Sequence, residues 1–252
     1  MAKHSNAGQS QQPGRRTLMQ TIGLYTLYLL TQVLGIGMIS LGCLWVNKHL
    51  GGMKLDGTPE QLFNYHPVLM ATGMLFINAN GILFYRTGGC LKYSTQKFIH
   101  FLVQLTGLGV TLAGAYAAYT YHTLKHIPHY YSLHSWLGGA LIVTQASGTL
   151  GAFFVFLWPQ GSYGFKRAVL PLHTFVGAVG FVLAAGVAIT GVTEKALFSL
   201  TSKGQEYRDL PAPALLLNAF GVSIVLFVIS VVYLLTRSDY KRPDVAVDRK
   251  KD

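Results

Sequence analysis

The sequence contains little charge. Only 12% of its 252 residues are Asp, Glu, Lys or Arg, whereas 51% are hydrophobic. Soluble domains carry about 25% charged residues, so a soluble protein with several buried core helices is a poor interpretation. Acidic residues are the scarcest charged class, 9 against 20 Lys and Arg, which leaves a formal net charge of +11. The basic residues flank apolar stretches and form no single basic domain, which argues against nucleic acid as a partner.

Several motifs are also absent. The chain has no Cys-x-x-Cys-His, which excludes covalent attachment of a c-type haem. It has no Gly-x-Gly-x-x-Gly after a predicted strand and no soluble domain to carry one, which argues against NAD(P)H as a reductant. Its two cysteines, Cys43 and Cys90, fall in the first apolar segment and in a loop. We therefore expect no structural disulfide between them.

What the sequence does contain is six long apolar segments without internal charge. Each has at least the ~20 residues needed to cross the hydrocarbon core of a bilayer. The six predicted transmembrane helices are residues 17–46, 62–85, 97–121, 131–157, 168–193 and 211–236. We therefore predict an all-α membrane protein with a disordered cytoplasmic segment at 1–16, a transmembrane domain at 17–236 and a basic cytoplasmic tail at 237–252.

The basic residues predict the orientation of these helices. With six crossings, both termini share one side of the membrane with the second and fourth loops. Fourteen of the 20 Lys and Arg residues lie on that side, and six lie on the other. The positive-inside rule therefore places both termini in the cytoplasm. The positive cytoplasmic face is suited to attract anionic headgroups of the bilayer or a small anionic solute.

Four histidines lie at corresponding places in the predicted helices. His66, His100, His134 and His173 are spaced by 34, 34 and 39 residues, about one turn inside the second to fifth helices. Because consecutive helices run in opposite directions, His66 and His134 lie near one membrane face, and His100 and His173 near the other. In a four-helix bundle of helices 2–5, each pair is diagonal. Two facing imidazoles are the axial ligands of a haem iron, so we predict two non-covalent b haems, about 18–20 Å apart.

Two other interpretations of these histidines stay open. Histidines inside a membrane bundle also relay protons, as in a transporter or proton channel. Such a protein is colourless, whereas a b-type cytochrome has sharp absorption bands after reduction with dithionite. Within the haem proteins, a quinol-driven reductase with two haems is the closer alternative, and the sequence does not exclude it.

Longer motifs around these histidines resemble the cytochrome b-561 family of ascorbate-dependent transmembrane electron carriers. The resemblance runs from about residue 17 to 243 and includes "FNYHPVLM", "YSLHSW", "GVTEKALFSL" and "YLLTRSDYKRP". It implies six helices, a homodimer and two b haems, which relay electrons without catalytic side chains. It also implies electron flow from cytosolic ascorbate to monodehydroascorbate or ferric iron outside. The expected locations are the plasma membrane and the membranes of secretory or endolysosomal vesicles.

The resemblance also implies roles for individual residues. The residues expected to contact the non-cytoplasmic haem are His66, His129, Tyr130, Tyr131, Ser132, His134 and Glu194. Those expected at the cytoplasmic haem are Arg86, His100, His173 and Lys241, where the basic pair would face the haem propionates.

Substrate sites are implied on both sides of the membrane. Ascorbate is a monoanion and requires a cationic pocket, for which the candidates are Lys92, Lys97, Lys166 and Arg167. Tyr93 departs from the family pattern, which often has a lysine there, and the neighbouring Lys92 is a substitute. On the acceptor side, His122 stands twelve residues before His134 and is expected to bind ferric iron or to assist proton movement. Together with His126 and His129 it forms a second candidate metal site.

Overall fold

The computed structural model describes residues 16–201, 204 and 206–241, and these contain helices and no strand. Six helical segments are long and apolar enough to cross a membrane, as predicted. They are α1 (Leu18–His49), a second span at Pro59–Thr87, α5 (Tyr93–Leu124), a fourth span at Leu133–Leu157, α7 (Tyr163–Thr201) and α8 (Ala212–Thr236). Residues 1–15 and 242–252, in the two predicted terminal segments, lie outside the described residues.

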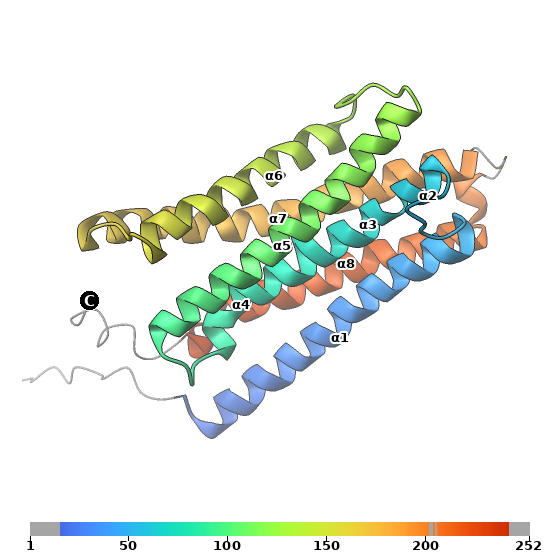
Figure 1. The fold of residues 1–252 in the computed structure, drawn as a ribbon. Coiled ribbons are helices and arrows are strands. Elements are labelled where there is room, and N and C mark those ends of the chain that lie inside the picture. The colour runs from blue at the N-terminus through green and yellow to red at the C-terminus, as the bar shows by residue number, and fades with distance from the viewer. Residues whose placement is uncertain (1–15, 202–203, 205, 242–252) are drawn as a thin grey trace, which may run out of the picture.

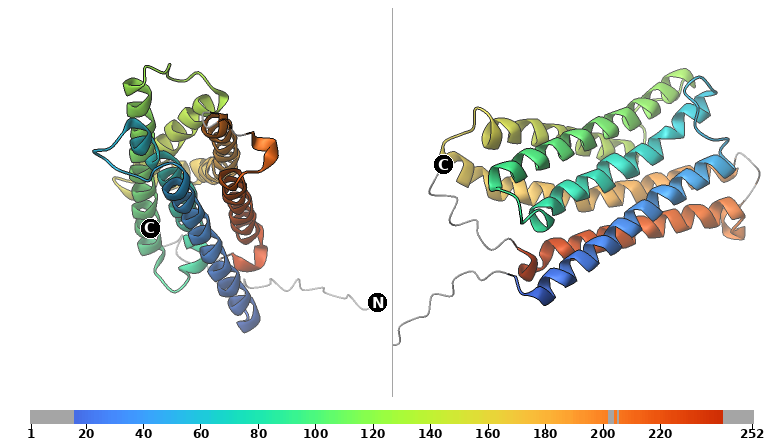
Figure 2. Two further views of the ribbon diagram at one scale, coloured as in Figure 1. Left: turned by 90° about the vertical axis from the view of Figure 1, so that its right-hand side faces the viewer. Right: turned by 60° about the horizontal axis from the view of Figure 1, so that its bottom comes forward.

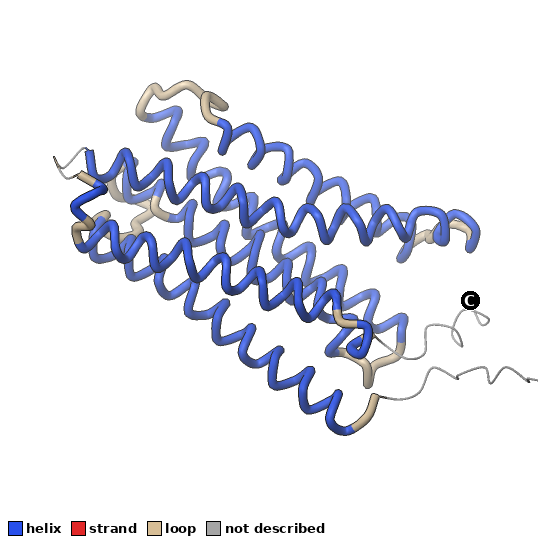
Figure 3. Tube along the Cα trace, turned by 180° about the vertical axis from the view of Figure 1, so that it is seen from behind, coloured by secondary structure: helices blue, strands red, loops and turns tan. Residues whose placement is uncertain are grey.

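Two of the spans are built from several elements. The second consists of α2 (Pro59–Phe63), α3 (Tyr65–Met70), the π-helical turn η1 (Ala71–Ile77) and α4 (Asn78–Thr87). The fourth consists of α6 (Leu133–Ala152) and the π-helical turn η2 (Phe153–Leu157). Two short 3-10 turns, η3 (Tyr207–Asp209) and η4 (Ser238–Tyr240), precede and follow α8. Seen from behind, the loops lie only at the two ends of the molecule (Figure 3).

Several helices begin earlier than the sequence predicts. The prediction started two helices at residues 97 and 168, whereas α5 starts at Tyr93 and α7 at Tyr163. The first turns of both helices carry Lys or Arg, because such side chains reach the interface while their backbone stays helical. As a result His100 is the eighth residue of α5 and His173 the eleventh of α7. His134 is the second residue of α6, and His66 is the eighth residue of the span that begins at Pro59.

The second to fifth spans form a closed ring of neighbouring helices. The second span packs on α5, α5 on α6, α6 on α7, and α7 on η1 and α4. Figures 1 and 2 show this arrangement, with α1 and α8 packed on each other along one side. Spans two and four are therefore diagonal in the bundle, and so are spans three and five. This is the four-helix bundle that the sequence predicts.

The second span and α5 approach each other unusually closely. A Cβ added to Gly73 would lie 2.8 Å from the carbonyl oxygen of Gly107, and one on Gly107 would lie 3.1 Å from that of Gly73. Small residues permit such backbone contact between membrane helices.

The two ends of the described chain meet at one end of the bundle. Figure 1 shows the start of α1 and the end of α8 on the same side, and Arg16 donates a hydrogen bond of 2.6 Å to the carbonyl of Tyr240.

Candidate functional site

The four histidines form two facing pairs inside the bundle. His66 of α3 lies opposite His134 of α6, with ring centroids 6.0 Å apart and ring planes at 88°. His100 of α5 lies opposite His173 of α7, at 6.4 Å and 80°. Neighbouring side chains include Phe63, whose ring is 5.5 Å from that of His66. The structure thus brings together the two pairs expected from helix direction alone.

The spacing within each pair fits a metal ion bound between two imidazoles. A bond from a metal to an imidazole nitrogen is about 2 Å long, and the nitrogen lies about 1 Å from the ring centre, so two opposed bonds separate the centroids by about 6 Å. Imidazole nitrogens are also the usual protein ligands of haem iron. The pairs therefore fit haem iron in both distance and donor chemistry.

Hydrogen bonds determine which ring nitrogen is free in three of the four histidines. In each of these, Nδ1 lies within hydrogen-bond distance of a backbone carbonyl oxygen. The pairs are His66 with Gly114 at 3.0 Å, His100 with Gly81 at 2.7 Å, and His134 with Val187 at 2.9 Å. Because a carbonyl oxygen only accepts, Nδ1 is the protonated donor and Nε2 keeps its lone pair. This is the tautomer that an imidazole needs to bind a metal through Nε2.

The same hydrogen bonds give the distance between the two pairs. Gly114, which contacts His66, lies 14 residues after His100 on α5. Val187, which contacts His134, lies 14 residues after His173 on α7. At 1.5 Å per residue, both helices place the pairs about 21 Å apart along the bundle. The two pairs thus lie at opposite depths of the membrane domain.

Glycine packs directly against one histidine ring. A Cβ added to Gly191 would lie 2.6 Å from Cε1 and 2.9 Å from Nδ1 of His134. Gly191 is one helical turn after Val187, so its lack of a side chain lets the His134 ring reach that carbonyl. No pattern in the sequence identifies Gly191, because its contact arises only from the packing of α7 on α6.

The segment before α6 is anchored to the end of α7. Glu194 accepts hydrogen bonds from the Tyr131 hydroxyl at 3.0 Å and from the Ser132 hydroxyl at 3.3 Å. Partial burial, together with the hydrogen bond and charge of Glu194, raises the pKa of Tyr131 to about 12. The neighbouring Tyr130 has a left-handed backbone, with φ of 53°, and its carbonyl accepts a bond from the Trp136 indole. These contacts bring Glu194 next to the segment with which the sequence analysis grouped it.

His122 stands in a row of nearly parallel rings at the same end of the molecule. Its ring centroid is 5.7 Å from that of His129 and 6.0 Å from that of Tyr131, and His129 stacks on Tyr119 at 4.5 Å. Parallel rings do not direct their nitrogens at a common point. Among the described residues, no group of three His, Cys, Asp or Glu side chains is placed to hold a metal ion. The predicted site formed by His122, His126 and His129 is therefore not assembled.

Lys195 is a residue near this end that the sequence analysis did not select. Its ammonium group lies 4.4 Å from the centroid of the Phe63 ring, the same ring that contacts His66. Glu194 and Lys195 are neighbours in sequence but contact different segments, the residues before α6 and the helix α2, because consecutive helical residues point about 100° apart. The sequence motif contains both charged residues but does not indicate which part of the protein each side chain contacts.

At the opposite end, Arg86 binds backbone groups. Its side chain is buried and donates hydrogen bonds to the carbonyl of Arg237 at 2.8 Å and to that of Leu235. These carbonyls belong to the end of α8, so Arg86 holds α4 against α8 and satisfies free helix-terminal acceptors. Two such bonds leave other guanidinium donors available. Lys241 follows η4 and is exposed.

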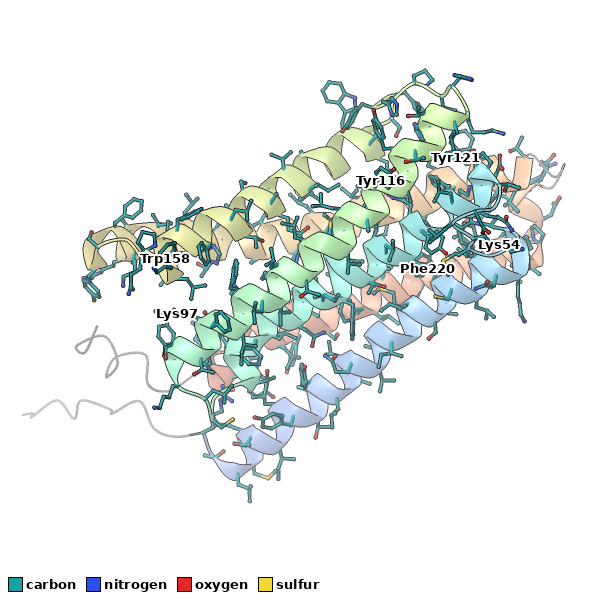
Figure 4. All side chains as sticks on the ribbon, viewed as in Figure 1. Lys54, Lys97, Tyr116, Tyr121, Trp158 and Phe220 are labelled. Carbon is teal, nitrogen blue, oxygen red and sulfur yellow. The ribbon has the colours of Figure 1, made fainter. Side chains whose placement is uncertain are left out.

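The four basic residues predicted to bind ascorbate also gather at this end. Lys92 precedes α5 and Arg167 lies in the first turns of α7, and both side chains are exposed. Lys97 lies 5.1 Å from the centroid of the Tyr93 ring, and Lys166 donates a hydrogen bond of 3.0 Å to Gln160. In Figure 4 Lys97 and Trp158 mark this end of the bundle, and Tyr121 and Lys54 mark the other.

Aromatic rings connect this surface with the second histidine pair. The ring of Tyr93 is 6.3 Å from that of Tyr85, which is 5.1 Å from the ring of His100. On the other side of the pair, Phe156 lies 5.5 Å from His173. Tyr93 and Tyr85 thus form a continuous path of rings from the start of α5 to His100.

Comparison with known proteins agrees with this geometry. The sequence profile of eukaryotic cytochrome b561 matches residues 65–199. The chain is 33% identical over 219 residues to the transmembrane ascorbate-dependent reductase CYB561 of Homo sapiens, covering 87% of this chain and 85% of that protein. It is 34% identical to the lysosomal membrane ascorbate-dependent ferrireductase CYB561A3 of Bos taurus, over 82% of this chain and 79% of that protein. It is 35% identical to the plasma membrane ascorbate-dependent reductase CYBRD1 of Xenopus laevis, over 79% of this chain and 70% of that protein. The chain belongs to the eukaryotic cytochrome b561 family.

Proposed function

We propose that this protein is a transmembrane oxidoreductase that passes single electrons from cytosolic ascorbate to an acceptor on the other side of the membrane. Relatives named ascorbate-dependent reductase and ferrireductase support this function. Membership of the cytochrome b561 family implies haem b, which supplies reversible one-electron chemistry when bound. The observation that carries the proposal is the presence of two imidazole pairs at different depths of one bundle.

Each pair would hold one haem, giving two per chain. His66 and His134 would ligate the one near the non-cytoplasmic face, and His100 and His173 the one near the cytoplasm. Carbonyl partners hold His66, His100 and His134 with Nε2 unprotonated, so no proton needs to leave these rings before the iron binds. Arg86 has donors left for a propionate at the cytoplasmic site, and Lys241 lies at the same end of the bundle.

On the cytoplasmic side, the positive charge of Lys92, Lys97, Lys166 and Arg167 would attract the ascorbate monoanion, and Lys92 and Arg167 are exposed. Tyr93 lies beneath the ammonium group of Lys97 and at the start of the ring path to His100. The anion would therefore dock where aromatic side chains bridge the distance to the pair formed by His100 and His173. The excess of Lys and Arg on this side supports a cytoplasmic orientation of both termini.

On the opposite side, His122 would meet the acceptor. Its Nδ1 lies 3.2 Å from the carbonyl of Pro128 and is therefore the donor, which leaves Nε2 free to bind ferric iron or to hold a proton. His129 and Tyr131 flank the ring and restrict its rotation. Tyr131 and Ser132 donate hydrogen bonds to Glu194 of α7. These bonds anchor the acceptor-side segment that precedes His134 to that helix. The acceptor is a ferric chelate or monodehydroascorbate.

The homodimer and the membrane of residence are further parts of the proposal. The resemblance implies a dimer, which cross-linking in native membranes tests. Relatives are named after the lysosomal and the plasma membrane. A secretory or endolysosomal membrane and the plasma membrane are the locations we propose, and imaging of the tagged protein distinguishes them.

The function is tested with proteoliposomes that contain ascorbate inside and a ferric chelate or monodehydroascorbate outside. We expect acceptor reduction by the wild type and its loss in His134→Ala. The matched control is His126→Asn, because His126 is an exposed loop histidine at the same end of the bundle and asparagine tolerates its left-handed backbone. Full activity of His134→Ala, or reduction of the protein by a quinol but not by ascorbate, would contradict the proposal. A protein without b-type absorption bands would instead support a proton relay.

A further inference from the structure

A polar side chain that has no partner in the described part of the chain lies inside the bundle, on the same face of α6 as His134. The residues His134, Gly138, Leu141, Gln145 and Thr149 follow one another at intervals of three or four and therefore share one helix face. Leu141 packs against the core and Thr149 is buried. The Gln145 carboxamide therefore points into the protein and away from lipid.

Gln145 is also halfway between the two histidine pairs. It lies eleven residues after His134 of the first pair and eleven residues before Phe156, whose ring contacts His173 of the second pair. Along the fourth span, Gln145 thus marks the middle of the distance that an electron has to cross.

Both polar atoms of this side chain are buried and lack a hydrogen-bond partner among the described residues. Other amides in the bundle find one, since Asn80 donates to the carbonyl of Phe76 at 2.9 Å and Gln104 to that of Asn78 at 3.4 Å. An unpaired carboxamide in an apolar interior costs a few kcal/mol, and here a donor and an acceptor are unpaired together. The missing partner must both accept and donate a hydrogen bond.

We propose that Gln145 binds an internal water molecule between the two histidine pairs and that this polar contact is part of the electron path across the membrane. A buried water typically makes about three hydrogen bonds and satisfies polar groups that lack other partners. Electronic coupling decays less steeply along bonds and hydrogen bonds than across empty space. Gln145 is thus a positioning residue for electron transfer. The inference rests on the proposed function, because it needs two redox sites in one chain.

The test compares Gln145→Met with Gln32→Met in the purified, haem-loaded full chain. Methionine keeps the length of the side chain and removes its donor and acceptor. Gln32 is the matched control, because its Nε2 is also buried without a partner among the described residues, but it lies on α1, which carries none of the four histidines. Oxidised-minus-reduced infrared spectra, in ordinary water and in water enriched in the heavy oxygen isotope, detect an internal water. Electron transfer between the two haems is followed after rapid reduction by dithionite.

We expect an isotope-sensitive water band in the wild type and in Gln32→Met, and its loss in Gln145→Met. We also expect transfer between the sites to slow severalfold in Gln145→Met alone, because the hydrogen-bonded contact no longer contributes to the electronic coupling. Absence of the band from the wild type, its survival in Gln145→Met, or equal transfer rates in the two variants would overturn the inference. Because dithionite replaces ascorbate as the reductant here, failure of this inference is distinguishable from failure of the proposed function. The proposed function fails if ascorbate does not reduce the protein.

Discussion

Gly191 offers a direct test of the site, because the His134 ring occupies the space where a side chain would begin. In Gly191→Ala, the new Cβ would lie 2.6 Å from Cε1, 2.9 Å from Nδ1 and 3.1 Å from Nε2 of that ring. Carbon atoms in contact are normally about 3.5–4.0 Å apart, so the ring has to move by about 1 Å. Metal–ligand distances tolerate only about 0.2 Å. The movement also strains the 2.9 Å bond to the carbonyl of Val187.

The same contacts give the expected loss of folding stability in Gly191→Ala. Overpacking a filled interior costs about 1–3 kcal/mol, and the strained hydrogen bond adds about 1 kcal/mol. Gly186→Ala is the control on the same helix, because nothing lies within 4 Å of a Cβ at that position. Since alanine is the better helix former by about 1 kcal/mol, Gly186→Ala is expected to stabilise the protein slightly. The two substitutions are therefore expected to change the free energy of unfolding in opposite directions.

The assay is haem content per chain, with the absorption spectrum and the thermal midpoint in detergent. We expect Gly191→Ala to lose about half of its haem and to keep the spectrum of the other site. Gly186→Ala is expected to retain all of it. Full haem content and an unchanged spectrum in Gly191→Ala would refute the assignment of His134 as a ligand held by close packing.

Three further outcomes follow from the structure. On the proposed function, His100→Ala is expected to lose the haem near the cytoplasm. Ascorbate should then no longer reduce the protein, whereas dithionite should still reduce the remaining site; rapid reduction by ascorbate would contradict this. In Arg86→Met, the end of α8 loses two hydrogen bonds from a buried side chain, and calorimetry should show a stability lower by about 2–4 kcal/mol. The pKa of Tyr131, about 12, lies above its ordinary value of about 10. The stability that Tyr131 contributes is therefore complete below about pH 10 and lost as the pH rises through 12. Tyr131→Phe, compared over the same pH range, should lack this decrease, and an identical alkaline decrease in both proteins would refute it.

The agreement between sequence and structure is greatest for features that depend on local pattern. A charge-free stretch of sufficient length is apolar enough to span a membrane whatever surrounds it, so all six spans were predictable. Helix ends were less predictable, since α5 begins four residues before the predicted start at Lys97, and Lys166 lies inside α7, which the prediction started at residue 168. The pairing of His66 with His134 followed from helix direction, which alternates with each crossing.

The cluster at His122 shows where such reasoning stops. Three histidines within eight residues indicate a metal site by spacing alone. In the structure the chain turns through His126, which has a left-handed backbone with φ of 54°, and brings His129 back to lie parallel with His122. Ring orientation depends on this turn and on the stack with Tyr119 and Tyr131, which sequence spacing does not encode.

The sequence by itself therefore determined the six membrane spans, the four histidines and their distribution between the two membrane faces, because each depends on composition, length or helix direction. Only the tertiary structure decided which carbonyl orients three of the four imidazoles, why Gly191 has no side chain and that Gln145, between the two pairs, has no hydrogen-bond partner among the described residues. These features depend on how far each helix is rotated and how closely it packs against its neighbour. Contacts between residues far apart in the chain set that rotation, and no local pattern records it.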